Sequence, residues 1–247
     1  MSGFAASKAQ LAYNLLSPVL YVFIVGFGYL GIVNFINIGG KLVNYVLFVT
    51  PGIITVQIMS VSLQTGMTLF LDRQTGMFDQ LLACPFSRRD YVLSKVISIV
   101  IQGLASGLFV LLIGIPILLG TIGSLASLWN LLLVIVSLTM TAVFFGSIML
   151  TTVTFIRSVQ KFNILFNTLY LPIMFLSSAF YPLENAPKLL SIVALGNPLT
   201  YSTDLLRSGL LDVQTSIEPL ELVATMVLGV IALVSAFIAF NRVTVEQ

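Results

Sequence analysis

The chain has 247 residues, of which 58% are hydrophobic and only 8% are charged. Since a soluble domain is roughly a quarter charged, this composition excludes a soluble domain and indicates an integral membrane protein. The net charge of +2, the absence of histidine and the single cysteine, Cys84, give no support for a nucleic-acid partner, a histidine metal site or an internal disulfide.

Windows without charged residues locate the membrane-spanning helices, because a helix needs ~20 mostly apolar residues to cross a bilayer. The longest window breaks at residues 120–130, where Gly, Ser and Trp129 indicate a turn at the membrane surface. The sequence therefore predicts one all-α integral membrane domain over residues 1–247. Its six transmembrane helices are expected at 14–33, 45–69, 96–119, 129–154, 162–181 and 220–241. The first apolar segment is longer than that of a signal peptide and is expected to be retained.

The basic residues set the expected orientation. With the N-terminus in the cytoplasm, eight Lys and Arg residues lie on the cytoplasmic side and three on the outer side. This asymmetry favours N-in and C-in by the positive-inside rule. Residues 70–95 then form a charged cytoplasmic loop, and residues 181–219 form the largest outer loop.

Several kinds of transport protein and enzyme fit this sequence poorly. The charge-free windows offer no ionisable group for a proton-coupled carrier, a proton pump or a voltage sensor. They also offer no carboxylate pair or Ser/His arrangement for an intramembrane enzyme. Gly40-Lys41 is followed by Leu42, so the chain has no GxxxxGK[ST] nucleotide-binding loop. Energy for uphill transport would have to come from another chain.

Residues 70–95 predict a short amphipathic helix between two helix breakers, Gly76 and Pro85. Phe78, Leu81 and Leu82 share one face, at positions i, i+3 and i+4. The basic residues that flank this helix are Arg73, Arg88 and Arg89. Spacing alone fits two interpretations equally: a helix that docks on a partner protein, and a helix that lies on the membrane surface with basic anchors.

Two stretches of the sequence carry distinctive motifs. The first reads Pro51-Gly52, then Asp72-Arg73-Gln74-Thr75-Gly76-Met77, Leu81-Leu82, Pro85-Phe86-Ser87-Arg88 and Lys95. The second reads Phe180-Tyr181-Pro182-Leu183, Pro187, Asn197-Pro198-Leu199-Thr200-Tyr201 and Arg207. The two motifs resemble those of ABC-2 type transporter permeases, the membrane subunits of a class of ABC exporters. The first motif departs from the family pattern at Gln74 and Met77, where Glu and Thr are usual.

The resemblance implies an exporter subunit of the drug- and lipid-exporting branch in the cell (plasma or inner) membrane. Two permease copies would pair, as a homodimer or with a related permease, and two separate ATP-binding subunits would bind the ATP and Mg²⁺. This chain would bind no cofactor and catalyse no reaction. The expected cargo is hydrophobic or amphiphilic: a drug-like compound, a lipid or a lipid-linked glycan. The implied ATPase-coupling residues are Arg73, Gly76, Phe78, Leu81, Leu82, Pro85, Arg88 and Arg89.

The outer loop has two interpretations, a gate at the exit and a plain connecting cap. The gate residues implied by the resemblance are Tyr181, Pro182, Pro187, Asn197, Pro198, Tyr201 and Arg207. The breakers suit short, re-entrant-like helices, and Asp204 is expected to pair with Arg207 three residues on. Polar residues within spans would join helices or dimer partners, or else contact the cargo. These residues are Gln57, Gln64, Gln160, Asn163 and Asn167.

The pair Gly103 and Gly107 forms a GxxxG pattern that predicts close helix packing within the subunit. Two further functions stay open at this stage. One is an ion-coupled carrier that uses neutral ligands, and the other is a membrane assembly or anchor protein that transports nothing.

Overall fold

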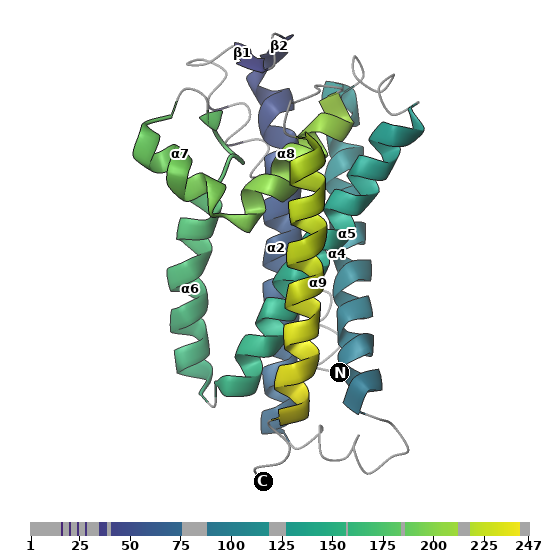
Figure 1. Ribbon diagram of the computed structural model, residues 1–247, viewed down its shortest axis with the longest axis vertical. Helices are drawn as coiled ribbons and strands as arrows, with labels where there is room; N and C mark the ends of the chain where they lie inside the picture. Colours follow the sequence, from purple (N-terminus) through teal and green to yellow (C-terminus); the bar gives the residue numbers. More distant parts are fainter. Residues whose placement is uncertain are drawn as a thin grey trace.

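The computed structural model describes most of the chain as a bundle of long helices (Figure 1). The described residues are 35–38, 41–75, 88–118, 127–156, 158–183, 186–211 and 218–242, with the single residues 16, 20, 24 and 28. The elements are β1 (Phe35–Ile38), β2 (Lys41–Asn44), α2 (Tyr45–Gln74), α4 (Arg88–Leu118), α5 (Leu128–Phe155), α6 (Val159–Phe175), α7 (Lys188–Leu195), α8 (Pro198–Leu211) and α9 (Glu218–Arg242).

Four helices of the described ranges are long and apolar enough to cross a membrane. Their apolar stretches are Tyr45–Gln64, Asp90–Leu112, Leu128–Phe155 and Pro219–Phe240. They coincide with the second, third, fourth and sixth predicted spans, and α4 and α5 are separated where the sequence predicts a break. The protein is therefore a multi-pass membrane protein. Of the first predicted span only four separate residues are described.

The long helices differ in how far the protein encloses them. In the apolar stretch of α2, 83% of the residues are buried, whereas only 28% are buried in those of α4 and α9. Helix α5 packs against α2, α4, α8 and α9. Hence α2 and α5 form the centre of the bundle, while α4 and α9 present apolar faces to their surroundings, as helices in contact with lipid do.

Small residues let α4 approach its neighbours closely. A Cβ atom at Gly103 would lie 3.2 Å from the Cβ of Ala142 on α5, and one at Gly107 would lie 3.4 Å from Leu138 on the same helix. Both glycines also face isoleucines of α2. The predicted close packing within the subunit is confirmed.

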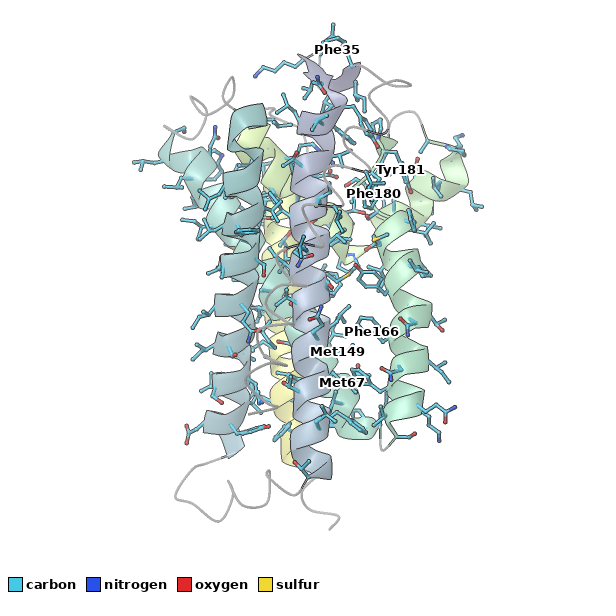
Figure 2. The ribbon with its side chains drawn as sticks, turned by 180° about the vertical axis from the view of Figure 1, so that it is seen from behind. Phe35, Met67, Met149, Phe166, Phe180 and Tyr181 are labelled. Atoms are coloured by element: carbon cyan, nitrogen blue, oxygen red, sulfur yellow. The ribbon has the colours of Figure 1, made fainter. Side chains whose placement is uncertain are left out.

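A β-hairpin, absent from the all-α prediction, precedes α2. Strands β1 and β2 pair antiparallel, with Phe35 opposite Asn44 and Ile38 opposite Lys41. Two glycines join them in the sequence, a pattern that favours two-residue hairpin turns and could have been recognised. Side chains alternate as in any strand: Ile36 is buried, whereas Phe35 is 64% exposed and lies at the top of the molecule (Figure 2).

The fifth predicted span ends earlier than the sequence indicates. Helix α6 has 17 residues and ends at Phe175, whereas the apolar window continues to 181. The Ser177 hydroxyl donates to the carbonyl of Met174 at 2.7 Å, and the chain then turns. The charge-free residues 176–180 are therefore not a helix end but the start of the turn that follows α6, which the absence of charge alone does not distinguish.

Helix α2 meets this turn backbone to backbone at Gly52. A Cβ atom there would lie 2.2 Å from the carbonyl oxygen of Ala179, closer than any real contact. The hydroxyl of Tyr45, two turns earlier, donates to the carbonyl of Phe180 at 3.2 Å. The glycine of the Pro51-Gly52 motif is thus required where the second span touches the outer turn.

We expect Gly52→Ala to destabilise the protein, because the added methyl group collides with the backbone of the outer turn. Gly107→Ala is the matched control, since its methyl group would make ordinary contacts and alanine favours a helix interior by about 1 kcal/mol. The measurement is the thermal midpoint of the detergent-solubilised protein by size-exclusion chromatography. Equal midpoints for the two variants would contradict the close approach at Gly52.

Candidate functional site

We call residues 176–183 and 186–211 the outer cap, after the side of the membrane on which the sequence predicts them. It contains two short helices, of which α7 lies to one side above α6, while α8 lies across the upper part of the bundle (Figure 1). Eleven of the fourteen residues of α8 are buried, and it packs against α2, α5 and α9. Helix α7 is different: Leu189, Ile192 and Leu195 are each more than half exposed. Within the cap, α8 is therefore an internal part of the bundle, whereas α7 lies on the surface.

Asn197 joins α6 to α8. Its side-chain amide donates to the carbonyls of Ile173 at 2.7 Å and Leu176 at 3.1 Å, which α6 leaves without helical partners. Its oxygen accepts from the backbone N–H of Leu199 at 3.0 Å, as an N-cap residue does. One buried amide group thus closes the end of one helix and the start of the next.

Arg207 is 6% exposed and connects α8 to two other parts of the protein, α2 and the turn after α6. Its guanidinium donates to the carbonyl of Phe48 on α2 at 3.3 Å and to the carbonyl of Ser178 at 2.9 Å. It forms an ion pair with Asp204, which confirms the predicted pairing. It also lies over the ring of Phe48, 3.9 Å from the ring centre. A buried cation needs such compensation, because desolvation is costly.

The ion pair is part of a small polar cluster at the outer end of the bundle. The Ser178 hydroxyl donates to the Asp204 carboxylate at 2.8 Å. Burial raises the pKa of Asp204 and lowers the pKa of Arg207, and the attraction between them opposes both shifts. Glu221 at the start of α9 is 3% exposed and also favours the charged form of Arg207. One network of charged and polar groups therefore joins helices α8 and α9 and the turn after α6.

Hydroxyl groups add two links between α8 and the central helices. Thr203 and Thr55 of α2 are hydrogen-bonded at 2.7 Å, and Ser137 of α5 donates to the carbonyl of Ser202 at 2.6 Å. Both contacts are buried. Since buried polar groups hold their partners strongly in apolar surroundings, these two adjacent residues of α8 fix the helix to α2 and α5.

The remaining predicted cap residues close local turns. The hydroxyl of Tyr181 donates to the carbonyl of Phe175 at 2.7 Å, and that of Tyr201 to the carbonyl of Leu195 at 2.5 Å. Pro187 precedes α7, where its carbonyl accepts the first helical hydrogen bond, and Pro198 is the first residue of α8, a favoured position. Pro182 lies in the turn that follows Tyr181.

The polar residues predicted within spans form two separate sets. Gln160, Asn163 and Asn167 are exposed on α6 and line one shallow surface depression. Gln57, on α2, is 4% exposed, and Gln64 donates to the hydroxyl of Ser60 one turn away at 3.3 Å. The three α6 residues thus share one surface depression, and the two α2 residues are not part of its lining.

The structure does not describe the side chains of the predicted coupling residues. Gly76, Phe78, Leu81, Leu82 and Pro85 lie outside the described residues, as do the side chains of Arg73, Arg88 and Arg89. Their role stays a prediction. In the described ranges no three acidic or cysteine side chains gather as a metal site would require.

Three residues of the outer cluster were not predicted: Phe48, Ser178 and Glu221. Phe48 and Ser178 act mainly through backbone carbonyls, which carry no sequence signal. Glu221 had one, because an acidic residue at the start of an apolar span is expected to be functional or paired. It was not singled out because the charge-free window that located the sixth span begins at the next residue, 222.

The sequence profile of the ABC-2 type transporter family matches residues 2–211. The chain therefore belongs to the ABC-2 type transporter family. It is also similar to a protein of Cyanophora paradoxa named "Putative transport permease ycf38", with 30% identity over 168 residues. The alignment covers 66% of this chain and 56% of that relative, so the chain spans little more than half the relative's length.

We expect Arg207→Met to destabilise the protein by about 3–5 kcal/mol, because it leaves Asp204 as a buried charge without its cation. Arg207→Met combined with Asp204→Leu should recover much of that loss, since both charges are then absent. The measurement is the unfolding free energy in mixed detergent micelles. If the double variant is no more stable than the single one, the ion pair does not hold the cap.

Asn197→Asp tests the link between α6 and α8. The carboxylate keeps the acceptor for Leu199 but replaces the two donors with an oxygen that repels the carbonyls of Ile173 and Leu176. We expect a lower thermal midpoint for Asn197→Asp than for Asn197→Ala, which only leaves these groups unpaired at about 1–3 kcal/mol. An Asp variant as stable as the native protein would mean that Asn197 only caps α8.

Proposed function

We propose that this chain is the membrane subunit of an ATP-driven exporter that moves a hydrophobic or amphiphilic cargo out of the cytoplasm. The cargo would be a drug-like compound, a lipid or a lipid-linked glycan. Two copies of the chain, or one copy and a related permease, would form the pathway in the cell membrane. Two separate ATP-binding subunits would bind ATP and Mg²⁺ and supply the energy.

The observation that carries this proposal is the family match over residues 2–211. It is supported by the absence of a nucleotide-binding loop from the printed sequence. A transporter of this family without such a loop depends on another chain for ATP hydrolysis. The charge-free windows of the spans favour a cargo that is itself largely apolar.

The segment 70–95 is the proposed attachment point of the ATP-binding subunit. Phe78, Leu81 and Leu82 would supply the apolar contact, and the flanking arginines would add charge complementarity. Because α2 ends and α4 begins at this segment, force applied here would reach two helices of the bundle directly.

The outer cap is the proposed gate at the other end. Its helix α8 is bonded to α2, α5 and the turn after α6. A change in the packing of α2 would therefore move α8, through Thr55 and the carbonyl of Phe48. The chain would transmit movement from the cytoplasmic segment to the cap through α2.

The polar face of α6 is the proposed contact with the second permease copy or with the cargo pathway. Gln160, Asn163 and Asn167 are exposed in the isolated chain. Amide groups facing hydrocarbon are costly, so such a face is expected to meet protein or water in the assembled transporter.

Co-purification tests the proposed function. An ATP-binding partner at one-to-one stoichiometry, with ATP hydrolysis stimulated by cargo in proteoliposomes, is the expected result. Transport that continues without that partner and stops when the ion gradient is removed would instead identify an ion-coupled carrier. A stable complex without any transport would identify an assembly or anchor protein.

We expect Leu81→Asp to abolish binding of the ATP-binding subunit and transport, while leaving the chain in the membrane. Gln80→Asp introduces the same charge on the other predicted face of the helix and is the matched control. The measurements are co-purification of the partner and cargo-stimulated ATP hydrolysis. Survival of both in Leu81→Asp would refute the docking assignment.

A further inference from the structure

The backbone of helix α6 stands apart from the backbone of the bundle along its middle (Figure 1). At the lower end, the ring of Phe162 lies against that of Phe70 on α2, with 6.0 Å between ring centres. At the upper end, Asn197 binds the last carbonyls of α6. Between these attachments a cleft separates α6 from α2 and α5. Figure 2 shows Met149 of α5 and Phe166 of α6 at the level of this cleft.

The lining of the cleft is apolar. The α6 side is a row of stacked rings, Phe162, Phe166 and Tyr170, with centres 6.4 and 5.6 Å apart. The facing side includes Met59 of α2 and Phe145 of α5. Apart from Tyr170, the one lining side chain with a hydroxyl is Thr152, and that group already donates to the carbonyl of Ile148 at 2.8 Å. The cleft is suited to hydrocarbon and not to a polar ligand.

The cleft has the length of an acyl chain within one lipid leaflet. Its cavity volume is about 120 Å³, with about 620 Å³ of space between protein atoms when the open side is included. It extends along α6 from Phe162 to Ile173, which is roughly 16 Å at 1.5 Å per residue, or about half of the ~30 Å hydrocarbon core. Half of the core is the depth of one lipid leaflet.

The cleft is also open along one side. Leu165 and Leu169 line it and are nevertheless 38% and 48% exposed. Lys161 precedes them at the same four-residue interval, so it lies in the same row, one turn nearer the start of α6. In the predicted orientation the start of α6 is cytoplasmic, which puts this exposed cation at the headgroup level of the inner leaflet.

We propose that the cleft between α2, α5 and α6 is a binding site for one acyl chain of an anionic phospholipid of the cytoplasmic leaflet. The chain fills the space beside the aromatic row, and the phosphate group lies near Lys161. A dry apolar cleft facing hydrocarbon takes in hydrocarbon rather than water. The bound lipid supports α6 between its two attachments. This inference does not depend on the proposed export function, since it concerns a resident lipid and needs no ATP-binding partner.

Photolabelling of the purified chain in nanodiscs tests this site. The probe is phosphatidylglycerol with a diazirine in the middle of one acyl chain, in a background of phosphatidylethanolamine. We expect labelled peptides from residues 144–152 and 162–173 to exceed those from the lipid-exposed faces of α4 and α9. Equal labelling of all exposed helices would refute the site.

A matched pair of neighbouring variants sharpens the test. Leu165→Trp fills the cleft and should reduce the labelling of α5 by roughly fivefold or more, because overpacking opposes the bound chain. Ile164→Trp adds the same side chain on the other face, where Ile164 is 59% exposed and lines the polar depression, and should leave the labelling unchanged. Both variants are first checked for monodisperse elution. Equal labelling of α5 in the two variants would refute the site.

The charge at the cleft entrance is tested separately. Lys161→Gln should remove the preference of the labelling for phosphatidylglycerol over phosphatidylcholine, whereas Lys188→Gln, on α7 of the outer cap, should retain it.

Two other occupants would overturn the proposal. Cysteine cross-linking of position 165 to residues 14–33 would place the first predicted span in the cleft, and cross-linking of position 165 between two copies would place a second chain there.

Discussion

The buried guanidinium of Arg207 is the interaction on which the outer half of the structure depends. A cation at this depth requires acceptors from several directions, and it finds them on α2, in the turn after α6 and in Asp204 of its own helix. Because two of these acceptors are backbone carbonyls, they exist only when α2 and the turn are already in place. The cap and the bundle therefore stabilise one another, and α8 is buried as part of the core instead of lying on the surface as a connector.

Close backbone approach is the second constraint, and it acts at the same place. Gly52 lets α2 touch the turn at Ala179, which brings the carbonyl of Ser178 to the guanidinium. The Pro51-Gly52 motif and the outer motif thus meet in space although they are more than a hundred residues apart in the chain. In contrast, α6 is held mainly at its ends, by a pair of aromatic rings and by Asn197. The apolar cleft lies between these two attachments.

Much of the arrangement was predictable from the sequence. Charge-free windows located the helices that cross the membrane, since lipid demands long apolar segments whatever the tertiary structure. The spacing of Asp204 and Arg207 predicted their ion pair, and the spacing of Gly103 and Gly107 predicted close packing. The end of α6 at Phe175 and the hairpin before α2 were not predicted. In the first case the charge-free stretch continues past the helix end, and in the second a double glycine lies between strands of only four residues.

The sequence by itself determined that this is a membrane protein of several spans with charged residues gathered in loops, because these properties follow from local composition. It also determined the family, because the two motifs keep their order and spacing. Only the tertiary structure decided that Phe48, Ser178 and Glu221 surround Arg207 and that α6 leaves an apolar cleft beside α2 and α5. The physical reason is that carbonyl acceptors and packing gaps are properties of chain segments brought together by folding. No single residue type along the chain encodes them.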